Sequence, residues 1–262
     1  MLKTRIIPTL LWKDHGLVKG VGFDSWRRVG TVLPSIKVYS TRQVDELILL
    51  DITATVEARA PDCDSVAELS AECFVPLTVG GGIRTIEHIR DLLRAGADKV
   101  SINSATYDNP GLVREAASRF GAQCVVASID ARRLPDGSLV CHSHSGTRSR
   151  DRHPASWATE LEALGAGEIL ITSVERDGTM EGYDLDLVRA VATAVRIPVI
   201  ASGGAGCYAH LLAALHEGGA SAVAAASIFH FTQQTPLQAK HYLATHGIPV
   251  RRHRLDTGVA KA

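Results

Sequence analysis

Residues 79–83, Val-Gly-Gly-Gly-Ile, decide the fold, because the unit that contains them occurs twice. Residues 75–105 (VPLTVGGGIRTIEHIRDLLRAGADKVSINSA) return in outline at 197–228 (IPVIASGGAGCYAHLLAALHEGGASAVAAASI). Each copy has an apolar run, a glycine turn, a segment with leucines at helical spacing, a Gly-Ala stop and a second apolar run. This order is typical of a strand–helix–strand unit.

The distance between the two copies indicates a chain made of two related halves. Pro76 and Pro198 are 122 residues apart, and Val100 and Val223 are 123 residues apart. Right-handed crossovers in such a chain close most naturally as a barrel, whereas an open doubly wound sheet would leave the equivalent glycine turns far apart. We therefore predict an α/β chain that forms a single (β/α)8 barrel over residues 1–262, with a flexible tail at 252–262.

The rest of the chain supplies the other strands and helices of such a barrel. Two segments interrupt the alternation, a glycine-containing one up to Gly30 and a polar, basic one at 131–152, and both are predicted to be mobile loops over the active site. Within the second, Asp136-Gly137 is a hairpin turn signal. The further strands are expected at 5–11, 45–53, 123–130 and 168–173, and the further helices at 33–44, 65–73, 110–120, 157–164, 185–195 and 237–245.

Composition excludes several classes of protein. Twenty-eight basic residues offset 28 acidic ones, so no general charge favours nucleic acid or an anionic membrane. The apolar start of the chain is too short for a signal peptide, which predicts a cytoplasmic protein. Five cysteines without CxxC spacing argue against disulfides or a thiolate zinc site, and the segment Cys141–His144 with His153 is not taken as a metal site. No cofactor is implied.

Polar residues and glycines gather where the predicted strands end. Because the C-terminal ends of barrel strands carry the chemistry, these residues predict the active site. Glycine turns that lead into helices can bind phosphate through backbone N–H groups. One predicted phosphate cradle comprises Gly82, Asn103 and Ser104, and the other comprises Asp177, Gly178, Gly204, Ala226 and Ser227. Two separated cradles imply a small-molecule ligand with a phosphate at each end.

Several longer motifs are similar to one family over residues 4 to 251. These are DELILLDITATVE, PLTVGGGIR, LRAGADKVSINSA, ERDGTMEGYDLDL, IPVIASGGAG and ASIFHF. Together they resemble HisF, the cyclase subunit of imidazole glycerol phosphate synthase. The resemblance implies a barrel that receives ammonia from a HisH-like glutaminase in a heterodimer. With that ammonia, the family cleaves a bisphosphorylated aminoimidazole carboxamide ribonucleotide.

The catalytic positions implied by the resemblance are only half present. The family places one aspartate at the end of strand 1 and one at the end of strand 5. Asp130 matches the second, whereas the first position holds Leu11. The internal repeat agrees, because alignment of RIIPTLL with CVVASID sets Leu11 opposite Asp130. Asp14 lies three residues further along and would need a rearranged strand end to substitute for the missing acid.

The pattern LLWKDHGLVK instead resembles a paralogous branch, the WbuZ-type proteins associated with amidation of surface-polysaccharide sugars. These are expected to pair with a HisH-like glutaminase and an amidating synthetase, so that the barrel passes ammonia onward. Two alternatives remain open. One is that the chain is a histidine-pathway cyclase with a displaced second acid, and the other is that it is a binding scaffold without turnover.

The resemblance assigns two further groups of residues. An ammonia gate at the N-terminal end of the barrel is expected from Arg5, Glu46, Lys99 and Glu168, with Asp98 as a contact for the glutaminase. Glu46 and Glu168 are repeat-equivalent, which supports a common location. Further active-site positions are expected at Lys19, Asp51, Thr179 and Ser202.

Overall fold

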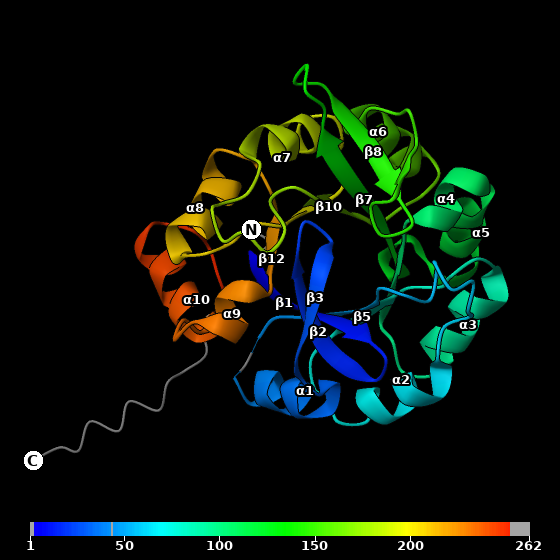
Figure 1. The fold of residues 1–262 in the computed structure, drawn as a ribbon, viewed down its shortest axis with the longest axis horizontal. Coiled ribbons are helices and arrows are strands. Elements are labelled where there is room, and N and C mark those ends of the chain that lie inside the picture. The colour runs from blue at the N-terminus through cyan, green and yellow to red at the C-terminus, as the bar shows by residue number, and fades with distance from the viewer. Residues whose placement is uncertain (1–2, 43, 252–262) are drawn as a thin grey trace, which may run out of the picture.

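The computed structural model describes residues 3–42 and 44–251, and these form a closed barrel of parallel strands (Figure 1). The eight barrel strands pair in sequence order, and the ring closes where the last strand pairs with the first. The prediction of a (β/α)8 barrel is confirmed, while the predicted tail lies outside the described residues. The barrel strands are β1 (Arg5–Lys13), β4 (Leu47–Asp51), β5 (Leu77–Gly80), β6 (Lys99–Ile102), β7 (Val125–Arg133), β10 (Glu168–Ser173), β11 (Val199–Ser202) and β12 (Ala222–Ala225).

Helices surround the barrel and alternate with its strands. Many begin at a side chain that caps the first turn, as Asp62 does by accepting the N–H of Ser65. Within the described residues, no helix combines the length and apolar character needed to cross a bilayer. The helices are α1 (Val32–Thr41), α2 (Cys63–Ser70), α3 (Ile86–Arg94), α4 (Ser104–Asp108), α5 (Gly111–Phe120), α6 (Pro154–Ala163), α7 (Leu185–Ala192), α8 (Tyr208–His216), α9 (Ser227–Phe231) and α10 (Pro236–Thr245), with a 3₁₀ turn η1 at Ala122–Cys124.

The two halves repeat each other in detail. Helices α2 and α7 have equal length and begin 122 residues apart, and Asp184 caps α7 as Asp62 caps α2. The short helices α4 and α9, which had not been predicted, are likewise equivalent. Asn103 and Ala226, which precede them, adopt similar backbone angles, with φ of −116° and −130°. The doubled sequence therefore folds as a doubled structure.

Strand register determines which side chains meet inside the barrel. Followed once around the eight strands, the pairing returns to β1 eight residues further along the chain. This is the shear of a (β/α)8 barrel, in which alternate strands supply the four side chains of each interior layer. The register then places Leu11, Gly82, Asp130 and Gly204 together in the layer at the C-terminal mouth.

Below the mouth the barrel interior is filled mainly by aliphatic side chains. Large residues here pack against each other as a core separate from the one between strands and helices. This arrangement divides the interior into a polar mouth, an apolar plug and a charged ring at the N-terminal end. The plug comprises Ile7, Ile48, Val126, Leu170, Ile200, Ala222 and Ala224.

The two predicted mobile loops are in fact β-hairpins, so that prediction was wrong. Strand β1 continues past Leu11 and turns back at Asp14 and His15, both at positive φ, into β2 (Gly16–Val21) and β3 (Asp24–Gly30). This two-residue turn suits a hairpin. The glycines of this segment masked its strand character in the sequence.

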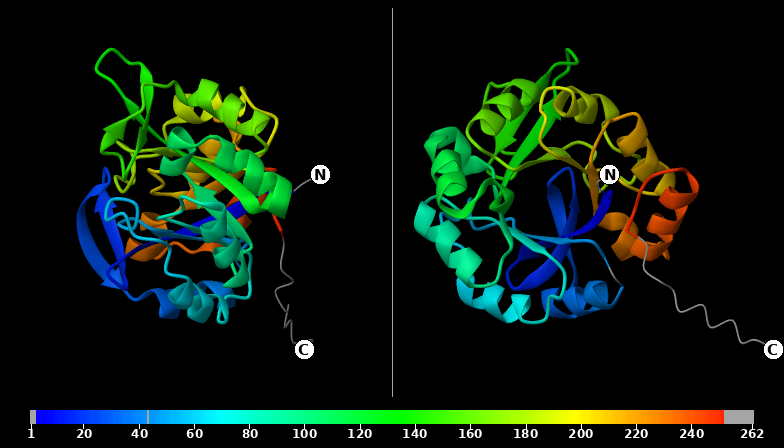
Figure 2. Two further views of the ribbon diagram at one scale, coloured as in Figure 1. Left: turned by 90° about the vertical axis from the view of Figure 1, so that its right-hand side faces the viewer. Right: turned by 180° about the vertical axis from the view of Figure 1, so that it is seen from behind.

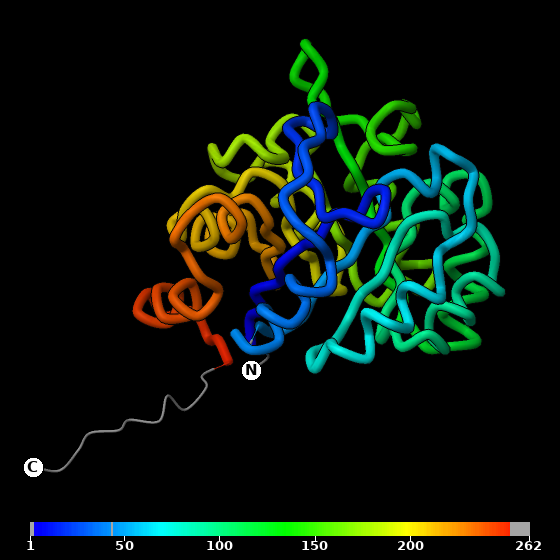
Figure 3. Tube along the Cα trace, turned by 60° about the horizontal axis from the view of Figure 1, so that its bottom comes forward, coloured from blue at the N-terminus to red at the C-terminus, as the bar shows by residue number. Residues whose placement is uncertain are grey.

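The second hairpin occupies the equivalent place in the other half. Strand β7 continues to Arg133 and pairs with β8 (Leu139–Ser143), which in turn pairs with β9 (Arg148–Ser149). The turn at Asp136-Gly137 is confirmed and projects beyond the barrel (Figure 3). Both hairpins lie at the end of the barrel opposite the N-terminus (Figure 2).

A buried ion pair connects the last helix to the first strands. Lys240 of α10 lies 2.6 Å from an oxygen of Asp45, and the other oxygen of Asp45 accepts the N–H of Ile6 at 3.0 Å. Both side chains are almost fully buried. Removal of one partner from such a pair leaves a charge without compensation.

Lys240→Ala should therefore lower the free energy of unfolding by about 3–5 kcal/mol, as measured by urea denaturation. Arg119→Ala is the control, because Arg119 forms an exposed pair with Glu115 and should change stability by less than ~1 kcal/mol. Equal effects of the two substitutions would show that the buried Lys240–Asp45 pair stabilises the fold no more than an exposed pair does.

Candidate active site

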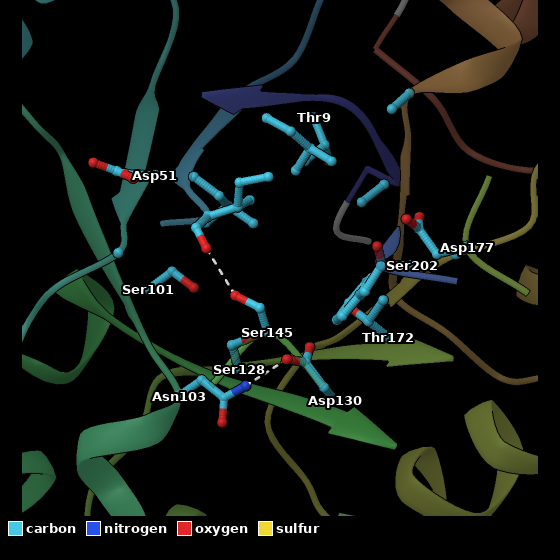
Figure 4. Close-up of a pocket in the computed structure, with 18 of the residues that line it drawn as sticks. Thr9, Asp51, Ser101, Asn103, Ser128, Asp130, Ser145, Thr172, Asp177 and Ser202 are labelled. Carbon is cyan, nitrogen blue, oxygen red and sulfur yellow. Dashed lines mark hydrogen bonds between the residues drawn. The ribbon is translucent and has the colours of Figure 1, made fainter. Parts of the chain in front are cut away.

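A cavity opens at the C-terminal mouth of the barrel and contains most of the predicted site residues (Figure 4). Strand ends, the loops that follow them and both hairpins contribute to its wall. Thr179 is not part of this lining, because it lies in the turn after β10 and its hydroxyl donates to the carbonyl of Arg176. The predicted residues that line the cavity are Leu11, Lys19, Asp51, Gly82, Asn103, Ser104, Asp130, Asp177, Gly178, Ser202, Gly204, Ala226 and Ser227.

The four residues of the mouth layer form two pairs, and the members of each pair lie on opposite sides of the cavity. Asp130 and Leu11 come from barrel strands half a turn apart, and Gly82 and Gly204 follow the two strands between them. Both glycines have positive φ, at 70° and 108°. One axis therefore joins two glycine turns, and the other joins a carboxylate to an aliphatic side chain.

Asp130 is held in a setting that favours proton transfer near neutral pH. Its carboxylate accepts a 2.7 Å hydrogen bond from the side-chain amide of Asn103. Burial and then the charge of Asp177 raise the pKa of Asp130 to about 7, although the Asn103 bond and the charge of Arg132 act in the opposite direction. A general acid or base is most effective when its pKa lies near the working pH.

The first hairpin brings a cation into the cavity. Lys19 of β2 is buried, and burial lowers its pKa while the charge of Asp177 opposes the shift. Burial raises the pKa of Asp177, and the charge of Lys19 partly opposes this shift. The hairpin is fastened at this point, because Gly22 N–H donates to the carbonyl of Asp177 at 2.9 Å.

Gly178 lies so close to the same hairpin that no side chain fits there. A Cβ at this position would lie 2.1 Å from the carbonyl oxygen of Gly20, and Gly178 has φ of +78°. The need for glycine here thus comes from hairpin packing as well as from any ligand.

Other predicted site residues already have protein partners. Asp51 accepts the N–H groups of Thr53 and Ala54 and forms a salt bridge with Arg59 at 3.2 Å, so it organises the loop after β4. The hydroxyl of Ser104 accepts the N–H of His144 from the second hairpin at 3.0 Å.

The beginnings of α4 and α9 are the features that suit anions best. Helical N-termini leave backbone N–H groups without helical acceptors. Neither Asn103 nor Ala226 caps its helix with a side chain, and both helices start at the cavity wall. Each start is adjacent to a glycine of the mouth layer, which permits close approach of a ligand.

At the opposite end of the barrel, the four predicted gate residues form a closed ring of ion pairs. Arg5 contacts Glu46 at 2.7 Å and Glu168 at 3.0 Å. Lys99 contacts the same two carboxylates at 3.0 and 3.2 Å. The hydroxyl of Thr78 also donates to Glu46. The structure thus brings all four charges together across the barrel.

Asp98 lies beside this ring and is exposed. One of its carboxylate oxygens accepts the N–H of Leu77 at 2.8 Å, which fixes its position at the start of β6. Within residues 3–42 and 44–251, its other oxygen accepts no hydrogen bond.

Comparison with known families agrees with this architecture. A family model described as histidine biosynthesis protein matches residues 5–235, which span the barrel from β1 to the segment before α10. The chain belongs to this family. The barrel fold and membership in this family are therefore shown, and the specific reaction is treated below.

Sequence reasoning missed part of this family member's cavity wall. Phe23 and Trp26 of the first hairpin and Ser145 of the second line the cavity, but their segments had been interpreted as loops. A second group consists of hydroxyl side chains deeper in the barrel. They are Thr9, Ser101, Ser128 and Thr172. The signal was present for the first three, because inward positions alternate along a strand and these residues lie two positions before Leu11, Asn103 and Asp130.

The raised pKa of Asp130 predicts a pH-dependent cost to stability. In the unfolded chain an aspartate ionises near pH 3.9, whereas in the fold Asp130 ionises near pH 7. The fold therefore loses stability relative to the unfolded chain as pH rises from about 4 to about 7. Asp130→Asn removes this loss and should be more stable than the wild type by roughly 4 kcal/mol at about pH 8, with little difference at about pH 4.

Urea unfolding of both proteins across this pH range measures the effect. Asp136→Asn serves as the control, because hydrogen bonds from Ser138 lower the pKa of that exposed carboxyl and should reverse the sign. A stability difference that does not change with pH would mean that Asp130 ionises normally in the fold.

Proposed function

We propose that the chain is the ammonia-receiving barrel subunit of a glutamine amidotransferase complex. A HisH-like glutaminase would dock on the N-terminal end and release ammonia at the ring of Arg5, Glu46, Lys99 and Glu168. The ammonia would cross the barrel to the mouth and serve amidation of a surface-polysaccharide sugar by a separate synthetase. The observation that carries the proposal is the pairing of an intact charged ring with Leu11 in the mouth layer.

The charged ring supports entry of ammonia from that end. Four alternating charges neutralise each other at the bottom of an otherwise apolar barrel, where unpaired charges would be costly. A ring of salt bridges can open by side-chain rotation without disturbing the backbone. Asp98, exposed next to Lys99, supplies a charge for a partner at the rim.

The mouth supports ligand binding more strongly than proton transfer. The two glycine turns and two helix starts could hold the ends of a bisphosphorylated ligand between them. Asp130 remains available on one side of that ligand. Leu11, which lines the other side, can neither donate nor accept a proton. This asymmetry favours transfer of ammonia onward over cyclase chemistry at the mouth.

The alternative function is the cyclase of histidine biosynthesis with a displaced second acid. Asp14 does not favour it, because that residue is exposed in the β1–β2 turn and does not line the cavity. The observation on its side is Asp177, a cavity-lining carboxylate whose charge acts on Asp130. If a second acid exists, Asp177 is the candidate that this cavity offers.

Replacement of Leu11 tests the choice between these functions. With ammonium and the family's bisphosphorylated ribonucleotide, the wild type should turn over about 10²–10⁴-fold more slowly than an enzyme with both groups. Leu11→Asp should raise the steady-state rate at least about tenfold, because the ligand cradle and Asp130 are already in place. Leu11→Asn, which has similar polarity but no acid, should leave the rate low. Fast turnover by the wild type that depends on Asp177 would instead support the cyclase.

The proposed gate is tested by measuring how much of the ammonia released from glutamine reaches the product. Lys99→Met breaks two contacts of the ring and should reduce the share of glutamine-derived ammonia used at the mouth, while use of external ammonium continues. The ratio of glutamine hydrolysed to amidated product, measured with a HisH-like glutaminase subunit, gives this share. Lys37→Met is the control, since its exposed pair with Glu72 lies outside the ring. No complex with such a subunit, or unchanged coupling in Lys99→Met, would contradict the docking proposal.

A further inference from the structure

Strand β3 of the first hairpin leaves one edge of the sheet without a neighbouring strand. Within residues 3–42 and 44–251, β3 pairs only with β2, and the one other strand that pairs on a single side is β9, which has two residues. Strand β3 has seven residues, five of them exposed. The backbone N–H and C=O groups on its outer side therefore have no strand partner, and such an edge is a template for one more strand.

The hairpin holds this free edge beside the opening of the cavity. Strand β3 lies over the barrel mouth (Figure 1), and its residue Trp26 lines the cavity. The tip of the hairpin is fastened where Gly22 N–H donates to the carbonyl of Asp177 at 2.9 Å. The guanidinium of Arg27 lies 4.2 Å from the centroid of the Phe231 ring, which connects β3 to α9. A strand added to β3 would therefore lie next to the mouth.

Two arginines give the free edge a positive charge. Arg27 and Arg28 are adjacent and exposed, and neither forms an ion pair with a carboxylate in the described part of the chain. Arg27 is the middle residue of β3, so a second copy paired about the centre of the strand would place Arg27 opposite Arg27. Like charges directly opposite each other destabilise a strand pair. The edge therefore favours an acidic segment over a second copy of the chain.

We propose that β3 accepts an acidic, extended segment of the amidating synthetase as an additional strand and so docks that enzyme at the mouth. Backbone hydrogen bonds along the edge supply affinity, and the two arginines supply the preference for carboxylates. A nucleic acid lacks the alternating donors and acceptors that a strand edge requires. The choice of partner rests on the proposed function, because a barrel that passes ammonia onward needs its acceptor where the cavity opens.

The first experiment tests strand addition with synthetic peptides as long as β3. The probe alternates valine and glutamate, and the charge control has lysine in place of glutamate. A third peptide has the acidic sequence with every backbone nitrogen methylated, so it keeps the charge but donates no backbone hydrogen bond. The acidic peptide should bind the full chain at least about tenfold more tightly than either control, as measured by calorimetry. Hydrogen-exchange mass spectrometry should show slower amide exchange within residues 24–30.

Charge reversal on the strand tests the role of the arginines. Arg28→Glu should weaken binding of the acidic peptide at least about fivefold and strengthen binding of the lysine peptide. Arg148→Glu is the matched control, because Arg148 is exposed on β9 and forms no ion pair among the described residues. Arg28 packs against Gly16, so Arg27→Glu gives an independent test should Arg28→Glu disturb the hairpin.

The second experiment tests the identity of the partner in the coupled amidation assay with glutaminase and synthetase. Arg28→Glu should raise the synthetase concentration needed for half-maximal amidation at least about fivefold, while the rate of glutamine hydrolysis is retained. Arg148→Glu should change neither quantity. An unchanged synthetase requirement in Arg28→Glu would overturn the assignment of the synthetase to this edge.

The peptide measurements have their own contrary results. Equal binding of the acidic and lysine peptides, undiminished binding of the methylated peptide, or protection outside β3 would overturn strand addition. Dimers of the chain that the acidic peptide dissociates would assign the edge to a second copy. These measurements use neither glutaminase nor ammonia. Strand addition without any glutaminase complex would therefore refute the proposed function alone, and coupled amidation without peptide binding at β3 would refute this inference alone.

Discussion

The register of the eight parallel strands is the constraint on which the rest of this structure depends. A shear of eight residues places interior side chains in layers of four, so every functional group in the barrel has a fixed height and a fixed set of neighbours. Charges lie at the N-terminal end, aliphatic residues above them, hydroxyls higher still, and the layer of Leu11 and Asp130 at the mouth. A slip of one residue in any strand would move its whole set to the other face.

The twofold repeat explains the symmetry of the site and shows where its two halves differ. Glycine turns, short helices and hairpins occur at equivalent places in each half, so the mouth has two similar ends. Leu11 and Asp130 occupy equivalent positions but differ in chemistry. This difference lies on the axis between Leu11 and Asp130 and leaves the two glycine turns and the charged ring unchanged. The halves also differ at Asn103 and Ala226, which precede α4 and α9.

The sequence predicted the parts of the molecule that repeat or alternate. The glycine turns, the strands and the charges at strand starts all carried periodic signals. The barrel was predicted correctly, the predicted mouth residues other than Thr179 line the cavity, and the four charges at the N-terminal end form one ring of ion pairs. The predicted helices were confirmed with shifted ends, as for Leu185–Ala192 in place of 185–195. The pattern did not extend to the two hairpins, since Gly16, Gly20 and Gly22 break the alternation in β2 and its turn.

Residues whose contacts come from distant parts of the chain could not be assigned from sequence. Lys19 enters the cavity only because the hairpin folds over the mouth (Figure 1). Thr9 lies in the same interior layer as Ser128 and Ser202, and only barrel closure brings these three residues together.

The central claim is that this barrel retains the machinery to hold a doubly phosphorylated ligand but lacks the second group needed to transform it. The most direct measurement is calorimetric titration of the wild type with the family's bisphosphorylated ribonucleotide in ammonium buffer, followed by product analysis of the same sample. The account predicts one ligand bound per chain, converted about 10²–10⁴-fold more slowly than by an enzyme with both groups. Rapid conversion of the ligand, or no binding at all, would contradict it.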